Sequence, residues 1–341
     1  MVCIAAFIIL ALVGLFVAIL SIFKREIGRA YWKVFKKAWG CVWKKVRLQK
    51  CETNFKDDVK NSILKKVVLK KPNLVKPLSI VIEVVSVIIV AVVVWAIIIS
   101  IKSLLALWAL GTCNVSHPAS CALGSESCSI DEEDLNWFSE WGEIFAAIPD
   151  RFKSWQAEDY LVEPVLKLNE FKNGNPSALD VMDPGCSACL QSYKNQLASD
   201  FSETHNIYIM VYPIELDDGT YKFNNSGIIA RYIHASNLKS TDYGLKILNR
   251  IFTEKNEDGI IYQNIFNNVL ENEEAEELLK SWLKEFGATD EETEELSKLA
   301  NSDEVTEIMQ KVKEVVNEKI RAKGIPTLIY NERKHLGLFK I

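Results

Sequence analysis

Two long apolar runs dominate the pattern of hydrophobic and polar positions near the start of the chain. The first covers residues 1–23 without a charged side chain, and the second covers residues 79–102, where only Glu83 and the closing Lys102 are charged. At about 1.5 Å per residue, each run can cross the roughly 30 Å hydrocarbon core of a bilayer as a helix. No basic residue precedes the first run and no small-residue cleavage site follows it, which favours a transmembrane helix over the alternative of a signal peptide.

The segment between the two runs, residues 24–78, has apolar positions at helical spacing and lysines at many of the others. It holds 17 Lys and Arg residues against 4 acidic residues. Because short basic loops stay in the cytoplasm, both termini are expected outside it. The pattern, with Trp43 among its apolar positions, predicts a basic amphipathic helix on a surface of anionic lipid. Nucleic acid binding is the alternative that charge alone leaves open, and we do not expect it.

Residues 103–159 follow the second run and change character part-way. A polar stretch rich in Ser, Cys and Gly comes first, and apolar positions at helical spacing follow it as far as Pro149. Ser129 or Asp131 is the expected N-terminal cap of that helix. We interpret this segment as an extracytoplasmic linker with amphipathic helices.

Residues 160–341 have the pattern of an α/β domain. Apolar runs of strand length occur at Ala178–Met182 and Ile207–Ile214, and a short closing strand is predicted at His335–Phe339. Between them, residues 226–323 carry a helical period throughout, with breaks that divide them into five or six short helices. The pattern therefore predicts a sheet interrupted by a helical insertion.

Charge separates the chain into two parts. The net charge of −5 combines residues 1–110, with 18 basic and 5 acidic residues, and residues 111–341, with 22 basic and 40 acidic residues. Such asymmetry indicates that the two parts face different surroundings. It agrees with a two-pass membrane protein whose acidic C-terminal domain is extracytoplasmic.

Eight cysteines add a constraint on this topology. Cys41 and Cys51 fall in the cytoplasmic loop and are expected to be free, whereas the other six lie on the oxidising side. Three pairs are expected there: Cys186 with Cys189, and two structural disulfides of undetermined pairing. The cysteines of these structural disulfides are Cys3, Cys113, Cys121 and Cys128. A zinc site formed by Cys113, Cys121 and Cys128 with His117 is the alternative, although its spacing is irregular for zinc.

The stretch Asp183-Pro-Gly-Cys186-Ser-Ala-Cys189 carries the candidate chemistry. It joins a predicted strand to a predicted helix, so Cys186 is expected at the helix start. Unpaired backbone N–H groups and the helix dipole stabilise a thiolate there. Cys189 lies about one turn later, within reach of the first sulfur, as thiol–disulfide exchange requires. A structural disulfide or half of a metal site is the alternative for such a pair.

Two further features lie outside this motif. Asp180 stands six residues before Cys186, in the strand that leads to it, where its carboxylate could take a proton from Cys189. Near the C-terminus, Gly324-Ile325-Pro326-Thr327 opens a β-type run, in which a proline is tolerated only before the ladder or as a cis residue.

Together these residues resemble the thioredoxin superfamily, and the surroundings of the cysteines are most similar to periplasmic DsbA/DsbC-type oxidoreductases and their membrane-anchored relatives. The resemblance covers residues 160–341 and includes the position of the helical insertion. It implies a nucleophilic Cys186, a resolving Cys189 and a buried acid at Asp180. It also implies that Pro326 is a cis-proline facing the disulfide, with Ile325 contacting substrate backbone.

The fold expected from the sequence is therefore an α/β, thioredoxin-like fold with a helical insertion, preceded by two transmembrane helices. The expected function is thiol–disulfide exchange on secreted or surface proteins. No organic cofactor is required, and the resemblance implies a quinone-linked membrane protein or thiol relay as redox partner. Because Ser187 and Ala188 depart from the family's usual choices, oxidase, isomerase and reductase stay open. A non-catalytic binding subunit of a membrane complex is the alternative.

Overall fold

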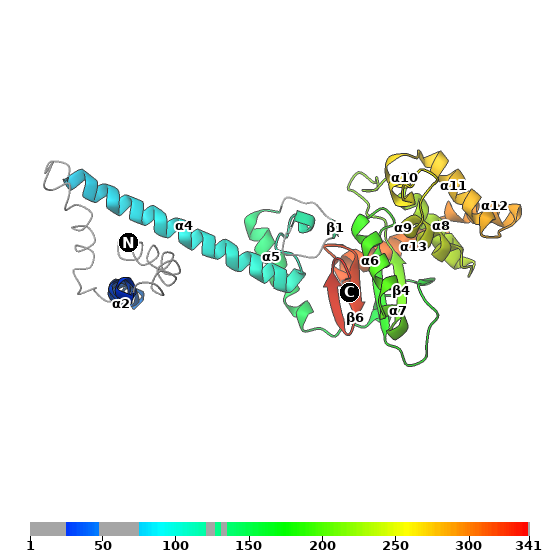
Figure 1. Ribbon diagram of the computed structural model, residues 1–341. Coiled ribbons are helices and arrows are strands. Elements are labelled where there is room, and N and C mark those ends of the chain that lie inside the picture. Colours follow the sequence, from blue (N-terminus) through cyan, green and yellow to red (C-terminus); the bar gives the residue numbers. More distant parts are fainter. Residues whose placement is uncertain (1–24, 48–74, 121–126, 131–134, 340–341) are drawn as a thin grey trace. The chain divides into compact units, whose positions relative to one another are not determined.

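The computed structural model describes residues 25–47, 75–120, 127–130 and 135–339 (Figure 1). The chain divides into two compact units, Met1–Ile101 and Lys102–Ile341. The first predicted transmembrane run, Cys3, Cys51 and Cys121 lie outside the described residues.

The first unit contains the predicted basic amphipathic helix, α2, over Arg25–Val46. Its side chains Trp32, Trp39 and Trp43 are about half exposed, and Lys36 lies over the ring of Trp32. Cys41 is buried and disulfide-bonded, so the expectation of a free thiol there is wrong.

Helix α4 runs without a break over Val75–Leu110, beyond both ends of the predicted 79–102 run. It is the one helix in the described part of the chain that is long and apolar enough to cross a membrane. The helix continues past Lys102, where the predicted membrane run ends, because the chain returns to apolar residues after it. The Lys102 ammonium pairs with Glu140.

Short elements follow α4 in the second unit. They are the 3₁₀ turns Pro118–Ser120, Pro149–Arg151 and Ala157–Tyr160, the strand β1 over Cys128–Ser129, and the helix α5 over Trp137–Ala147. The predicted caps of α5 are wrong: Asn136 caps it, accepting hydrogen bonds from the N–H groups of Phe138 and Ser139. Ser129 belongs instead to β1, and Asp131 lies outside the described residues.

A five-stranded sheet forms the centre of this unit, in the order β2-β4-β3-β6-β7. Its strands are β2 Leu166–Lys167, β3 Ser177–Met182, β4 Asn206–Val211, β6 Thr327–Tyr330 and β7 Arg333–Leu336. Strands β3 and β4 pair in parallel, and the other neighbours pair antiparallel. β3 is almost entirely buried, as expected of an apolar strand covered on both faces. A separate two-stranded sheet pairs β1 with β5, Gly324–Ile325.

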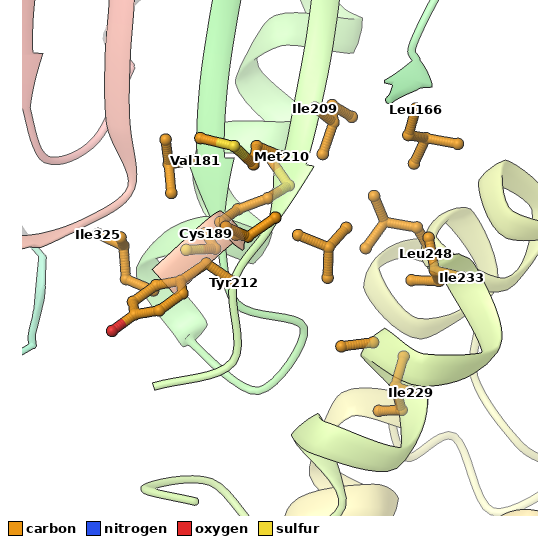
Figure 2. Close-up of a cluster of buried hydrophobic side chains, with 14 of the residues drawn as sticks. Leu166, Val181, Cys189, Ile209, Met210, Tyr212, Ile229, Ile233, Leu248 and Ile325 are labelled. Carbon is orange, nitrogen blue, oxygen red and sulfur yellow. The ribbon is translucent and has the colours of Figure 1, made fainter. Parts of the chain in front are cut away.

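Helices cover the sheet. Two of them, α6 Ser187–Ala198 and α7 Phe201–Thr204, connect β3 to β4. The predicted insertion contains six α-helices and a final π-helical turn, all within the described residues: α8 Ser226–Leu238, α9 Tyr243–Thr253, α10 Tyr262–Asn268, α11 Asn272–Glu285, α12 Asp290–Ala300, α13 Asp303–Glu314 and Val315–Ile320. Figure 2 shows how Ile229, Ile233 and Leu248 of the insertion join the sheet residues Leu166 and Ile209 in one core cluster.

Candidate active site

Cys186 stands where the loop after β3 enters α6. It is the N-cap residue of that helix, with extended backbone angles and no side-chain cap. Its sulfur therefore lies at the positive end of the helix. The loop passes so close to Phe223 that a side chain at position 185 would clash, because a Cβ there would lie 2.2 Å from the Cβ of Phe223. This contact explains why the residue is Gly185. The local sequence thus fixes the position of Cys186 as predicted.

The helical insertion holds the same loop from the other side. From α10, the amide nitrogen of Gln263 donates hydrogen bonds to the carbonyl oxygens of Pro184 (2.8 Å) and Cys186 (3.0 Å). Asn267, one turn along, donates to Gly185 O at 2.8 Å. Sequence analysis did not find these two side chains, since nothing local distinguishes them from other polar residues in a helix. The contacts make α10 part of the support of the site.

The C-terminal strands complete the site. The Ile325–Pro326 peptide bond is cis. The sulfur of Cys186 lies 3.7 Å from the carbonyl oxygen of Ile325, 139 residues away in sequence. The structure thus brings together the two segments that the sequence analysis linked only by resemblance.

The disulfide at this position differs from the expected one. Cys186 is bonded to Cys128, with 6.2 Å between their Cα atoms, and Cys189 is a free, buried thiol. The expected Cys186–Cys189 pair is therefore wrong for this state, and so is the expectation that Cys128 forms a structural disulfide with Cys3, Cys113 or Cys121. The physical reason is the pairing of β1 with β5, which places Cys128 directly opposite Ile325.

The remaining linker cysteines bear on the zinc alternative. Cys113 is disulfide-bonded, as expected for a structural cysteine on the oxidising side, and its partner is not among the described residues. Because Cys113 and Cys128 are both oxidised, neither can bind zinc as a thiolate. Over the residues that the structure describes, no group of His, Cys, Asp and Glu side chains forms a metal site.

Asp180 lies on the central strand β3 and is 1% exposed. One carboxyl oxygen accepts a hydrogen bond from Gln196, and the other, Oδ1, has no partner among the described residues. Burial raises the pKa of Asp180 to about 8. Burial also raises the pKa of the Cys189 thiol well above its usual value, and the charge of Asp180 raises it further. The charge of the Asp180 carboxyl thus acts on the protonation of the Cys189 thiol.

A second buried carboxyl, Asp183, was not identified from the sequence. Its two oxygens accept hydrogen bonds from the backbone N–H groups of Gly185 and Ile214, each at 2.7 Å. Burial raises its pKa to about 7, and its charge adds to the raised pKa of Cys189. The available signal was the Asp-Pro-Gly turn, where an aspartate commonly accepts from the backbone two residues on.

Three observations decide the fold of this unit: the strand order β2-β4-β3-β6-β7, a cysteine at the start of the helix after β3, and a cis-proline opposite it. The fold is thioredoxin-like. The helices inserted between β4 and β6 make it DsbA-like, as the resemblance implied.

Comparisons with known proteins gave the following. No family model matches the chain, and no curated protein matches its sequence. Among solved structures, a thioredoxin-like oxidoreductase from Silicibacter pomeroyi DSS-3 is 16% identical, covering 53% of this chain and 90% of that one, with a TM-score of 0.36. The thiol-disulfide exchange protein alpha-DsbA2 from Wolbachia pipientis is 15% identical, covering 54% and 87%, with a TM-score of 0.38. The thiol-disulfide oxidoreductase MdbA from Corynebacterium diphtheriae is 13% identical, covering 53% and 87%, with a TM-score of 0.38.

Proposed function

We propose that this chain is a membrane-anchored thiol–disulfide oxidoreductase acting on secreted or surface proteins. One observation carries the proposal. The sulfur of Cys186, at a helix start and 3.7 Å from the carbonyl of Ile325, is joined to a cysteine on a strand paired with that same residue. A disulfide between Cys186 and a strand-paired segment has the arrangement of a mixed disulfide with a bound peptide.

Exchange would proceed in two steps. A client thiolate attacks Cys186 of a Cys186–Cys189 disulfide; the client–Cys186 bond forms, and the electron pair leaves with Cys189, which takes up a proton. A second client thiolate then attacks the client sulfur and releases Cys186 as a thiolate. The reverse sequence reduces a client, with Cys189 resolving the mixed disulfide after passing its proton towards Asp180. Ile325 and Pro326 bind the client backbone.

The direction of electron flow depends on the redox partner that re-oxidises or re-reduces Cys186 and Cys189 after each exchange. Ser187 and Ala188, between the two cysteines, place no imidazole beside the thiolate. Oxidase, isomerase and reductase all use the steps above, and a quinone-linked membrane protein or a thiol relay would supply or remove the electrons.

The proposed location is a membrane, crossed twice, with both termini and the domain extracytoplasmic. Support for an anchor comes from the apolar helix α4 and from the basic helix α2, whose exposed Trp32, Trp39 and Trp43 suit an interface of anionic lipid.

A non-catalytic binding subunit is the second candidate. Cys186 and Cys189 are both fully buried, and Cys186 is closed by Cys128. A purely structural disulfide would also be buried in this way.

Trapping separates the two candidates. Because Cys128 occupies the site, the trap is the full-length protein with Cys128→Ser and Cys189→Ala, which leaves Cys186 without an internal partner in the site. We expect it to accumulate mixed disulfides with client proteins in cells, detected after acid quenching on non-reducing gels. The matched control, Cys128→Ser with Cys186→Ser, should trap none. A binding subunit would give no adducts in either variant and would still co-purify with one fixed partner.

A further inference from the structure

Residues 127–130 form an extended segment laid across the candidate active site. Cys128 pairs with Ile325 and Ser129 with Gly324 in antiparallel register, and the N–H of Ile130 donates to the carbonyl of Lys323 at 3.3 Å. This segment belongs to the linker before the thioredoxin-like domain. Its pairing partner is the strand that leads into Pro326.

The 127–130 segment is buried against the domain and hydrogen-bonded to it. Ser127, Ser129 and Ile130 are buried, and Ile130 belongs to the main apolar cluster of the domain. The ammonium of Lys222 donates to the carbonyl of Ser129 at 3.1 Å. The two backbones approach so closely that a Cβ on Gly324 would lie 2.9 Å from the carbonyl oxygen of Cys128.

An incoming client competes for the same positions. A peptide that pairs with Gly324 and Ile325, and places its cysteine on Cys186, needs the backbone groups and the sulfur that the 127–130 segment already uses. Occupation by the segment and by a client are therefore mutually exclusive. With the segment in place, Cys186 has no exposed surface for an external thiolate to reach.

We propose that residues 127–130 act as an internal client, with Cys128 as a third exchange cysteine whose release opens the active site. This proposal rests on the proposed exchange function. Its ligand class is an extended, cysteine-containing strand, for which the 127–130 segment substitutes in the resting state.

The opening step needs no external oxidant or reductant. In molecules whose Asp180 is ionised, Cys189 loses its proton to that carboxylate, and its thiolate attacks the sulfur of Cys186. The Cys186–Cys189 bond forms while the Cys128–Cys186 bond breaks, and the electron pair leaves with Cys128, which takes a proton from solvent. One disulfide and one thiol are present before and after the step. The protein then has an oxidised pair and an empty strand position beside β5.

Competition sets the expected size of the effect. A tethered thiol has an effective concentration on the order of millimolar, so against a client at about 0.1 mM it should slow capture by about tenfold. The experiment measures a single turnover of oxidised full-length protein in detergent with a reduced two-cysteine peptide at that concentration. We expect Cys128→Ser to oxidise the peptide about tenfold faster than the unaltered protein.

A second variant leaves every cysteine in place. Ile130→Ala weakens the docking of the segment and should also speed the turnover, whereas Ile144→Ala, an equally buried isoleucine in a separate apolar cluster, should not. Peptide mapping after acid quenching should find both Cys128–Cys186 and Cys186–Cys189 linkages in the unaltered protein, and only the former in Cys189→Ala.

The outcomes distinguish this proposal from the one it rests on. If the unaltered protein and both segment variants turn over at one rate, or if mapping never finds Cys186–Cys189, Cys128 is a static partner and the internal-client proposal fails. Peptide oxidation in that experiment would still support the exchange function. If neither the Cys128→Ser nor the Ile130→Ala protein exchanges with the peptide, the exchange function itself is wrong, and the internal client is excluded with it.

Discussion

Asp180 carries a proton in the folded protein under conditions where a solvent-exposed aspartate would not. Burial raises its pKa from 3.8 to about 8, so the fold favours the neutral carboxyl. The stabilisation from this proton is complete below about pH 4 and is lost as the pH rises through about 8. Asp183, with a pKa raised to about 7, acts in the same direction.

Replacing Asp180 by Asn removes the charge and keeps an acceptor for Gln196. At pH 9 we expect the variant to have a higher melting temperature than the unaltered protein and an unfolding free energy larger by an amount on the order of a few kcal/mol. Near pH 4 the two proteins should have the same stability. Thermal melting of the full-length protein in detergent across this range measures the difference. An unchanged pH dependence of melting in the variant would contradict the raised pKa.

The same variant should exchange more slowly, because Asn cannot accept the proton of Cys189. General acid–base groups contribute roughly 10²- to 10⁴-fold to rates, so we expect at least about a tenfold loss near pH 9, where most of Asp180 is ionised. The loss should shrink as the pH falls below about 8, because Asp180 then carries a proton and cannot accept another. Single-turnover rates against pH, measured in the Cys128→Ser background, would show it; a loss independent of pH would indicate a structural effect instead.

Sequence alone identified some residues of the site but not how the sulfurs are joined. Cys186, Asp180 and Pro326 could be found because strand, turn and helix signals place them close to fixed elements. Cys128 could not be assigned, because its position depends on a two-residue strand whose partner, Ile325, is almost 200 residues away. A pair of residues has no periodicity from which a strand can be recognised.

Helix α10 belongs to the insertion, yet it holds the loop that carries Cys186. Replacing Gln263 by Met keeps the volume and removes both hydrogen bonds, which leaves the carbonyls of Pro184 and Cys186 without this donor. We expect a loss of unfolding free energy of about 1–3 kcal/mol and a slower exchange reaction. Chemical unfolding and single-turnover exchange of the full-length protein measure the two effects.

Asn268→Ala provides the matched control, because this side chain lies on the same helix, is exposed and bonds only within α10. Its stability and exchange rate should stay within experimental error of the unaltered protein. Equal behaviour of the two variants would mean that α10 does not position the site.

The ends of helices and strands were predicted well where the apolar pattern extends over many residues. They were missed where the prediction depended on a single residue. The strands β3 and β4 and the insertion follow the predicted ranges closely, because their apolar periods extend over several turns or residues. For α4, Lys102 was interpreted as the end of the run, but the apolar stretch Leu104–Leu110 continues the helix. For α5, the capping residue is Asn136, later than the Ser and Asp that sequence favoured, because Ser129 is used in a strand.

The membrane topology is a property of the whole chain. If residues 24–78 are cytoplasmic and both termini are outside, an epitope tag after Ile341 should be removed by protease added to intact cells. A tag inserted after Arg47, at the end of α2, should survive until the membrane is permeabilised. The chain should also resist extraction by alkaline carbonate. Digestion of the Arg47 tag in intact cells, with survival of the C-terminal tag, would reverse the proposed orientation.

The register of β1 against β5 also limits the stage of folding at which a client protein could bind. A client that occupies this position must offer the unpaired edge of an extended strand around its cysteine, close enough for its backbone to pass over Gly324. Folded proteins protect their strand edges by pairing, covering or charging them. If the proposed exchange function holds, the domain would therefore meet its clients early, while newly exported chains are still unfolded, and mature proteins carrying the same cysteines would pass it unaltered.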